Sequence, residues 1–246
     1  MNEIAVGEET RGLSEAERVV DTFVAPSKTF ADIRRNASWW MPFLLMVISS
    51  LCSAYVVGSK VGWERVTENQ IHLSPKSEER LNELTPEQRD HQMALSSKIT
   101  MITTYCFPVI LLIVFALYSL VIWASFNFGL GATTTYKQVF AVSWYAALPF
   151  LILSVLGIIT VLFGGNAESY DIRNPVGTNL GYYFQDSPRM LRAILTQLDV
   201  VRLWSVALTI LGMSIVAKKT IGKSAMVVLF WWVIGLVFAV VGAAFS

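Results

Sequence analysis

Few residues in this chain of 246 residues have the types and spacing that catalysis or metal binding requires. The two histidines, His72 and His91, lie 19 positions apart with no cysteine or paired motif beside them. Zinc sites use ligands at much shorter spacings, so these histidines do not form a metal motif. Cys52 and Cys106 lie inside apolar runs, where cysteine packs as a small apolar side chain. We therefore predict no metal site and no cofactor.

Proton transfer and hydrolysis also lack candidate groups. Asp199 and Arg202 are the nearest ionisable residues to an apolar run, and their spacing is typical of an ion pair on one helix face. The serines of the apolar runs have no His, Asp or Glu beside them, and no glycine-rich phosphate loop is present. A net charge of +1 gives no basic surface for nucleic acid. We expect a protein that is not an enzyme.

The composition indicates that the hydrocarbon of a lipid bilayer, and not water, surrounds most of this chain. The chain is 54% hydrophobic and 15% charged, whereas an ordinary soluble domain carries about 25% charged residues. Charged residues are absent from five runs, at 36–59, 99–136, 138–167, 203–217 and 224–246, which together hold more than half of the chain. Such blocks are typical of a polytopic membrane protein.

The runs predict an all-α membrane protein with five transmembrane helices, because about 20 apolar residues cross a bilayer core as a helix. The spans are expected at about 39–58, 101–125, 138–163, 200–219 and 225–246. The fourth has an uncharged core of only 15 residues, and it spans only if flanking basic side chains reach back to the headgroups. Pro108 and Pro149 lie inside the second and third spans, where we expect kinks.

The segments outside the spans predict amphipathic and polar helices. In the N-terminal segment, 1–38, a helix starts at a capping box of Ser14 and Glu17, and a second short helix after Pro26 carries Phe30. We expect both to lie flat on the headgroups, with docking on the bundle as the alternative. The loop 59–98 predicts a polar helical hairpin. A helix starting near Ser187 could continue into the fourth span.

Small residues recur every four positions in the first and last spans of the membrane domain, 39–246. They are Ser50, Ala54 and Gly58 in the first span, and Gly235 and Ala239 in the last. Such stripes let helix backbones approach closely in lipid. Packing within one chain is the interpretation we favour, and a homo-oligomer interface is the alternative.

Charge counting leaves the orientation nearly tied. The N-terminal segment and the second and fourth loops hold nine Lys and Arg, against ten for the first and third loops. The dense group Lys218, Lys219 and Lys223 favours a cytoplasmic N-terminus.

Three segments, in the same order along the chain, carry a family resemblance. In the first segment, 23–42, Phe23, Pro26, Phe30 and Ile33 precede Trp39, Trp40 and Pro42. In the second, 136–149, Tyr145 lies one turn before Pro149. The third segment runs from Leu203 and Trp204 through Gly212 to Ala225. Together they resemble the Yip1-domain (Ypt-interacting protein) family, and its bacterial branch more than its eukaryotic members.

The resemblance implies five spans and a cytoplasmic N-terminus, and its bacterial branch implies the inner membrane. For eukaryotic members it implies Rab GTPases and related Yip proteins as partners, and roles in vesicle formation and membrane traffic. This chain has a short N-terminus and lacks the Asp-Leu-Tyr-Gly-Pro type of motif, so a small GTPase partner is weakly supported.

Two functional hypotheses follow. The first is a non-enzymatic membrane protein that organises the lipid bilayer, a second copy of itself or other membrane proteins through helix packing. The alternative is a channel or carrier for a neutral or lipidic substrate, with the kinked second and third spans lining its path. An enzyme acting on lipid headgroups is a distant third.

Overall fold

The computed structural model describes residues 12–164 and 170–245, and within these ranges the chain is built from helices. The α-helices are α1 (Glu15–Val24), α2 (Pro26–Ile33), α3 (Trp40–Lys60), α4 (Trp63–His72), α5 (Pro75–Asn82), α6 (Pro86–Tyr105), α7 (Phe107–Ala124), α8 (Tyr136–Ala146), α9 (Phe150–Phe163), α10 (Arg189–Gln197), α11 (Val200–Val216) and α12 (Ile221–Phe245). A π-helical turn, η1 (Ser125–Gly129), extends α7, and a 3₁₀ turn, η3 (Leu180–Tyr182), precedes α10.

Four helical segments within the described ranges are long and apolar enough to cross a membrane. They are Trp40–Lys60, Phe107–Gly129, Tyr136–Phe163 and Ile221–Ala244. The expected fourth span corresponds to α11, which has 17 residues. At about 1.5 Å per residue it is shorter than a hydrocarbon core of about 30 Å. The structure thus supports four spans by length and composition, and a fifth, shorter apolar helix.

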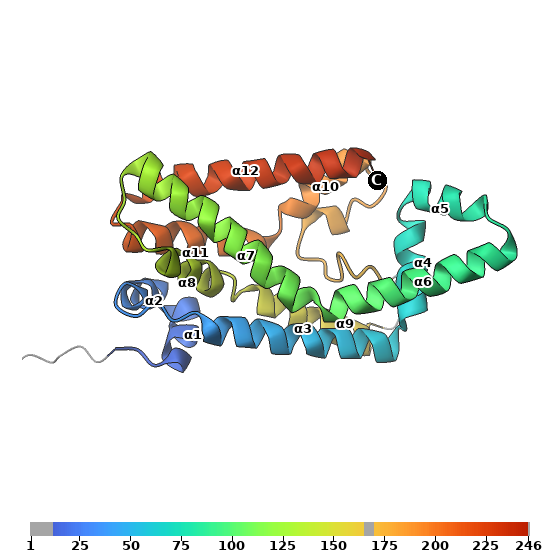
Figure 1. The fold of residues 1–246 in the computed structure, drawn as a ribbon, viewed down its shortest axis with the longest axis horizontal. Helices are drawn as coiled ribbons and strands as arrows, with labels where there is room; N and C mark the ends of the chain where they lie inside the picture. Colours follow the sequence, from blue (N-terminus) through green and yellow to red (C-terminus); the bar gives the residue numbers. More distant parts are fainter. Residues whose placement is uncertain (1–11, 165–169, 246) are drawn as a thin grey trace, which may run out of the picture.

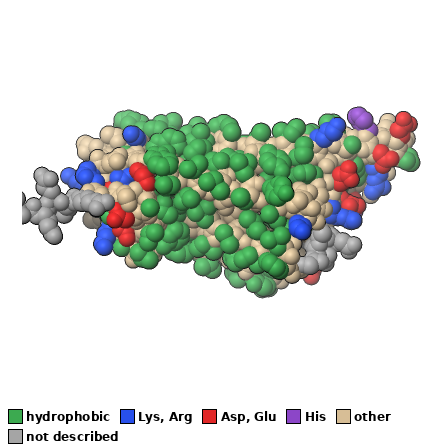
Figure 2. Space-filling view, turned by 90° about the horizontal axis from the view of Figure 1, so that it is seen from below, with side chains coloured by type: hydrophobic (Ala, Val, Ile, Leu, Met, Phe, Trp, Pro, Cys, Tyr) green, Lys and Arg blue, Asp and Glu red, His purple; other side chains and the backbone are tan. Residues whose placement is uncertain are grey.

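The long helices run along one axis of the molecule, and charge gathers at its two ends. In Figure 1, α3, α9 and α12 follow the long axis while α7 crosses it diagonally; the N-terminal helices lie at one end and α4, α5 and α6 at the other. Figure 2 shows a broad hydrophobic band between two groups of charged side chains. This distribution fits a bilayer around the middle of the bundle.

The centre of the bundle is α8, which is buried on every side. Residues 139–149 are all buried. Trp144 is fully buried, its ring stacked on Phe115 at a centroid distance of 4.5 Å and edge-on to Phe43 at 5.1 Å. Aromatic rings at these separations add to the packing energy beyond the area they bury.

Proline divides two of the predicted spans. Helix α6 ends at Tyr105 and α7 begins at Phe107, with Pro108 in its first turn, so the second apolar helix starts later than residue 101. In the third span, α8 ends at Ala146, and Pro149 is the N-cap residue of α9. Proline has no N–H and clashes with the preceding turn. The helix is interrupted at both positions, where kinks were expected, and the backbone at Cys106, Ala147 and Pro149 stays in the right-handed helical region.

The first loop and the fourth apolar segment also differ from expectation. Residues 59–98 form α5 and most of α6, the two helices of the expected hairpin, and one further helix before them, α4. Helix α10 is separate from α11, because the Asp199 carboxylate accepts hydrogen bonds from the backbone N–H groups of Val201 and Arg202 and so caps α11. Asp199 also bonds Thr178, whereas the guanidinium of Arg202 donates to Gln197 at 2.6 Å. The intrahelical contact expected for Asp199 and Arg202 is thus replaced by separate partners.

Serine hydroxyls join helices inside the apolar band. Ser154 of α9 lies 2.6 Å from the hydroxyl oxygen of Ser49 and 2.7 Å from that of Ser53, both on α3. Ser119 of α7 donates to Ser143 of α8 at 2.9 Å. Hydrogen bonds between helices hold membrane bundles together where apolar side chains gain little by leaving lipid.

Candidate functional site

The N-terminal helices dock on the bundle through apolar side chains. The capping box of Ser14 and Glu17 forms as predicted and starts α1. Phe30 and Ile33 of α2 are fully buried in the core, so these residues face protein and not the expected headgroup surface. The physical reason is that the bundle offers them a close-packed apolar surface.

Gly212 permits this docking. A Cβ at Gly212 would lie 2.7 Å from Cγ1 of Val142 and 2.9 Å from Cδ1 of Phe30. These distances are shorter than ordinary van der Waals contact, so only glycine lets α11 approach both α2 and α8 this closely. The Phe30 ring thus sits on the backbone of α11.

A buried ion pair holds α1 against α2. The Arg18 side chain is 1% exposed and that of Asp32 is 10% exposed, and Nη2 of Arg18 lies 2.6 Å from Oδ2 of Asp32. The Nε of Arg18 donates to the same oxygen at 2.6 Å. The backbone carbonyl of Arg18 accepts hydrogen bonds from the hydroxyls of Thr22 and Thr29. Two nitrogens of Arg18 thus share one oxygen of Asp32, and hydrogen bonds between two charged groups are stronger than those between neutral groups.

The same network reaches the centre of the bundle. The hydroxyl of Tyr145 donates to Oε2 of Glu15 at 2.9 Å, and Glu15 lies 3.4 Å from Nη1 of Arg18. Tyr145 is buried on α8, one turn before the break at Pro149. The N-terminal helices are therefore bonded to the divided third span.

The electrostatics of this site keep Arg18 charged. Burial disfavours the guanidinium cation, but hydrogen bonds to Asp32 and Tyr145 and the charge of Asp32 outweigh that effect. The pKa of Arg18 is therefore raised above its ordinary value. The guanidinium of Arg18 therefore stays charged at any physiological pH and holds α1 to Asp32 of α2.

Four of the residues singled out from the sequence meet at this site: Phe30, Tyr145, Trp204 and Gly212. We call these four residues, together with the ion pair of Arg18 and Asp32, the docking site. Trp204 contacts Phe23 edge-on at a centroid distance of 5.7 Å. Pro26 occupies the first turn of α2 and separates it from α1.

The small-residue stripes lie elsewhere. On α3, which packs against α9, Ala54 is buried and Ser50 is partly exposed. A Cβ at Gly58 would lie 2.7 Å from Nε1 of Trp63. On α12, Gly235 is exposed and a Cβ there would meet nothing within 4 Å, while Ala239 is partly exposed. The first stripe therefore faces protein at Ala54 and Gly58, and the second is open at Gly235.

Sequence reasoning missed the charged residues of the docking site. Arg18 and Asp32 are 14 positions apart on two helices, and nothing local to either residue marks the pair. One available signal was the position of Arg18 beside the apolar stripe of α1. Among the described residues, no group of three or more His, Cys, Asp or Glu could hold a metal ion. The ion pair and hydrogen bonds of this site join α1 to α2 and to the bundle.

Comparison with known proteins identifies one family. The family model of the Yip1 domain matches residues 20–242. The matched range includes three of the candidate spans, all but the last two residues of the fourth, and Phe30, Tyr145, Trp204 and Gly212 of the docking site. No curated protein and no solved structure matches the chain.

Proposed function

The chain belongs to the Yip1-domain family of membrane proteins, and we propose that it is a non-enzymatic protein that organises other membrane proteins through helix packing. In this proposal the docking site makes the N-terminal helices and the bundle one body, and α12 offers the surface that contacts a partner helix. The partner is a second copy of the chain or another integral membrane protein; a small GTPase has weaker support, because the chain lacks the Asp-Leu-Tyr-Gly-Pro type of motif. Turnover of a lipid by the purified protein would contradict the proposal.

The observation that carries the proposal is the open face of α12. Only 6% of its most apolar window is buried, against 17% to 28% for the other three candidate spans. Glycine in a helix interior costs roughly 1 kcal/mol relative to alanine. No described atom of this chain lies close enough to Gly235 to need a glycine there. Close approach of another membrane helix would account for it.

Replacing Gly235 by leucine tests the proposal without disturbing the monomer. Because a Cβ at Gly235 meets nothing within 4 Å, the variant should fold normally. We expect its assemblies to be smaller than those of the wild type in native mass spectrometry from membrane extracts. Gly222 at the other end of α12 also has open space, so Gly222→Leu is the matched control and should leave assembly unchanged. Equal assembly size in Gly235→Leu and the wild type would refute the proposal.

We further propose that the protein resides in a bacterial inner membrane with its N-terminus in the cytoplasm. The exposed cation Lys28 belongs to α2, Arg34 and Arg35 directly follow that helix, and Lys219 donates to the backbone carbonyl of Gly131. The two ends hold nearly equal numbers of basic residues, so the proposal follows the dense basic groups at this end, Lys28, Arg34 and Arg35 with Lys218, Lys219 and Lys223. Labelling of a cysteine introduced at Lys28 by a membrane-impermeant reagent in intact cells would contradict this orientation.

The channel hypothesis has less support. A path lined by the second and third spans would need polar space beside α7 and α8, yet residues 139–149 are buried in close-packed side chains. The large cleft of the described structure takes no lining residue from α7 or α8. We therefore do not adopt a channel or carrier as the function.

A further inference from the structure

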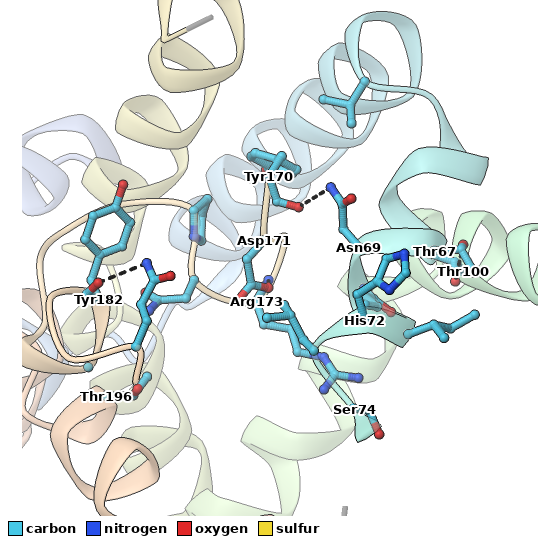
Figure 3. A pocket seen from close by; sticks show the side chains of 18 of the residues that line it. Thr67, Asn69, His72, Ser74, Thr100, Tyr170, Asp171, Arg173, Tyr182 and Thr196 are labelled. Carbon is cyan, nitrogen blue, oxygen red and sulfur yellow. Dashed lines mark hydrogen bonds between the residues drawn. The ribbon is translucent and has the colours of Figure 1, made fainter. Parts of the chain in front are cut away.

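A large cleft opens at the end of the bundle opposite the docking site. Its volume is about 1380 Å³, and it lies between α4, α5 and α6 on one side and the segment 170–197 on the other. Figure 3 shows His72, Arg173 and Tyr182 around this hollow, and Asn69 bonded to the backbone carbonyl of Tyr170 at 3.0 Å. Pockets for small molecules usually measure about 300–1000 Å³. The cleft therefore has room for a larger ligand.

The lining of the cleft is strongly basic. Among the described residues that line it, six are Lys or Arg and one is an acid, Asp171. The basic residues are Lys60, Lys76, Arg80, Arg173, Arg189 and Arg192. Clefts lined by one sign of charge focus the field and raise the local concentration of the opposite charge. The site favours an anion, although the whole chain has a net charge of only +1.

Helix α10 turns its polar face to this cleft. Arg189, Arg192 and Thr196 line the cleft, whereas Met190 and Leu191 on the opposite side are 51% and 45% exposed. Polar and apolar residues thus separate onto two faces of one helix, which is typical of a helix at a lipid–water border.

The cleft lies at the level where the membrane ends. Its lining includes the last residues of two candidate spans, Lys60 of α3 and Phe163 of α9. It also includes Ala239 and Ala243 in the last turns of α12. A ligand in the cleft would therefore contact cations and apolar helix ends together. Phospholipid headgroups occupy this level of a bilayer.

A second, smaller cavity adjoins the cleft and holds an unpartnered donor. Its volume is about 80 Å³, and it shares Arg173, Asn174 and Thr196 with the cleft. Arg202 lines it, and the Nε of Arg202 is buried without a hydrogen-bond partner among the described atoms. Buried donors are nearly always bonded, and this cavity, which Asp199 also lines, has room for a water molecule beside the donor.

We propose that this cleft binds the phosphate headgroup of an anionic phospholipid. Arg173, Arg189 and Arg192 contact the phosphate, because guanidinium groups match phosphate oxygens in charge and geometry. The acyl chains lie along the ends of α9 and α12. Basic pockets between membrane helices on the cytoplasmic side bind anionic lipid headgroups. With the N-terminus in the cytoplasm, this cleft would offer the same chemistry to the leaflet on the opposite side. A soluble phosphate shares the anionic chemistry but not the apolar contact. The proposal does not depend on the partner-organising function.

Binding of defined lipids by the full-length protein tests this inference. The protein in detergent is titrated with phosphatidylglycerol, with phosphatidylcholine and with inorganic phosphate, and bound lipid is counted by native mass spectrometry. We expect phosphatidylglycerol to bind at least about tenfold more tightly than phosphatidylcholine, and inorganic phosphate not to displace it at millimolar concentration. Displacement by inorganic phosphate would assign the cleft to a free anion and overturn the lipid assignment.

The triple variant Arg173→Gln, Arg189→Gln, Arg192→Gln identifies the site. Each surface cation contributes about a fivefold factor to anionic lipid binding, so we expect affinity to fall by about 100-fold. The control variant Lys28→Gln, Lys137→Gln, Lys223→Gln removes three exposed cations at the opposite end and should bind normally. Equal affinity of the triple variant and the control would overturn the proposal.

Two further variants guard against misfolding. Replacement of the same three arginines by lysine keeps the charge and should retain most of the binding. Ala193→Trp adds bulk inside the cleft while leaving all the cations in place, and it should weaken binding at least about tenfold. If lysine fails to rescue binding and Ala193→Trp binds normally, the lipid does not occupy this cleft.

Discussion

Loss of the Arg18 charge should undock the N-terminal helices far more readily than loss of Arg35. Both arginines pair with Asp32, at 2.6 Å for Arg18 and 2.8 Å for Arg35. The Arg18 side chain is 1% exposed, whereas that of Arg35 is 58% exposed. Removing one partner of a buried pair typically costs about 3–5 kcal/mol, and removing an exposed one about 0–1 kcal/mol. The two substitutions therefore remove, one at a time, the buried and the exposed partner of the same carboxylate, that of Asp32.

The measurement is hydrogen exchange of the α1 and α2 backbone amides by mass spectrometry in lipid nanodiscs. For Arg18→Gln, a loss of about 3–5 kcal/mol corresponds to exchange faster by about 100- to 1000-fold or more, up to the limit of complete undocking. For Arg35→Gln we expect less than about fivefold. Amides of α9, which lies outside the docking site, should exchange at the wild-type rate in both variants.

The double variant Arg18→Met, Asp32→Leu separates the ion pair from packing. Because an apolar pair of similar volume often replaces a buried ion pair without loss, the double variant should dock better than Arg18→Gln alone. If Arg18→Gln and Arg35→Gln accelerate exchange equally, the assignment of a buried, structural ion pair is wrong.

Two other substitutions test the packing of the bundle. Gly212→Ala should lower the free energy of unfolding by about 1–3 kcal/mol, because its Cβ would overlap Val142 and Phe30. Adding Phe30→Leu to this variant should restore part of the lost stability, as measured by thermal unfolding. Ser154→Ala removes hydrogen bonds to two serines of α3 and should lower the free energy of unfolding by about 0.6–2 kcal/mol. The measurement is unfolding in mixed detergent micelles. No measurable change would show that these bonds contribute nothing.

The spans could be predicted because hydropathy is a property of each segment by itself. The first, third and last runs give candidate spans close to the expected limits, and the break at Pro149 follows from proline chemistry. The length of α11 was the uncertain case, and its capping by Asp199 explains why it does not continue from α10. The family was also recognisable from residues such as Phe30, Tyr145 and Gly212, and the matched family model agrees.

The sites were harder to predict because their residues come from distant parts of the chain. The docking site joins Glu15 to Tyr145 across 130 positions. An amphipathic helix has the same pattern whether its apolar face covers lipid or protein, so Phe30 and Ile33 could not be placed by periodicity. The basic cleft draws on helices from α3 to α12, and its charge is invisible in the net charge of the chain.

The unequal halves of the third span have a consequence for biogenesis. Helix α9 is partly open to lipid, whereas α8 is enclosed by neighbours and carries Ser143, Trp144 and Tyr145. During synthesis α8 is made before α11, which packs against it. We expect α9 to settle in the bilayer as soon as it is translated, and α8 to reach its final environment only after α11 has been translated.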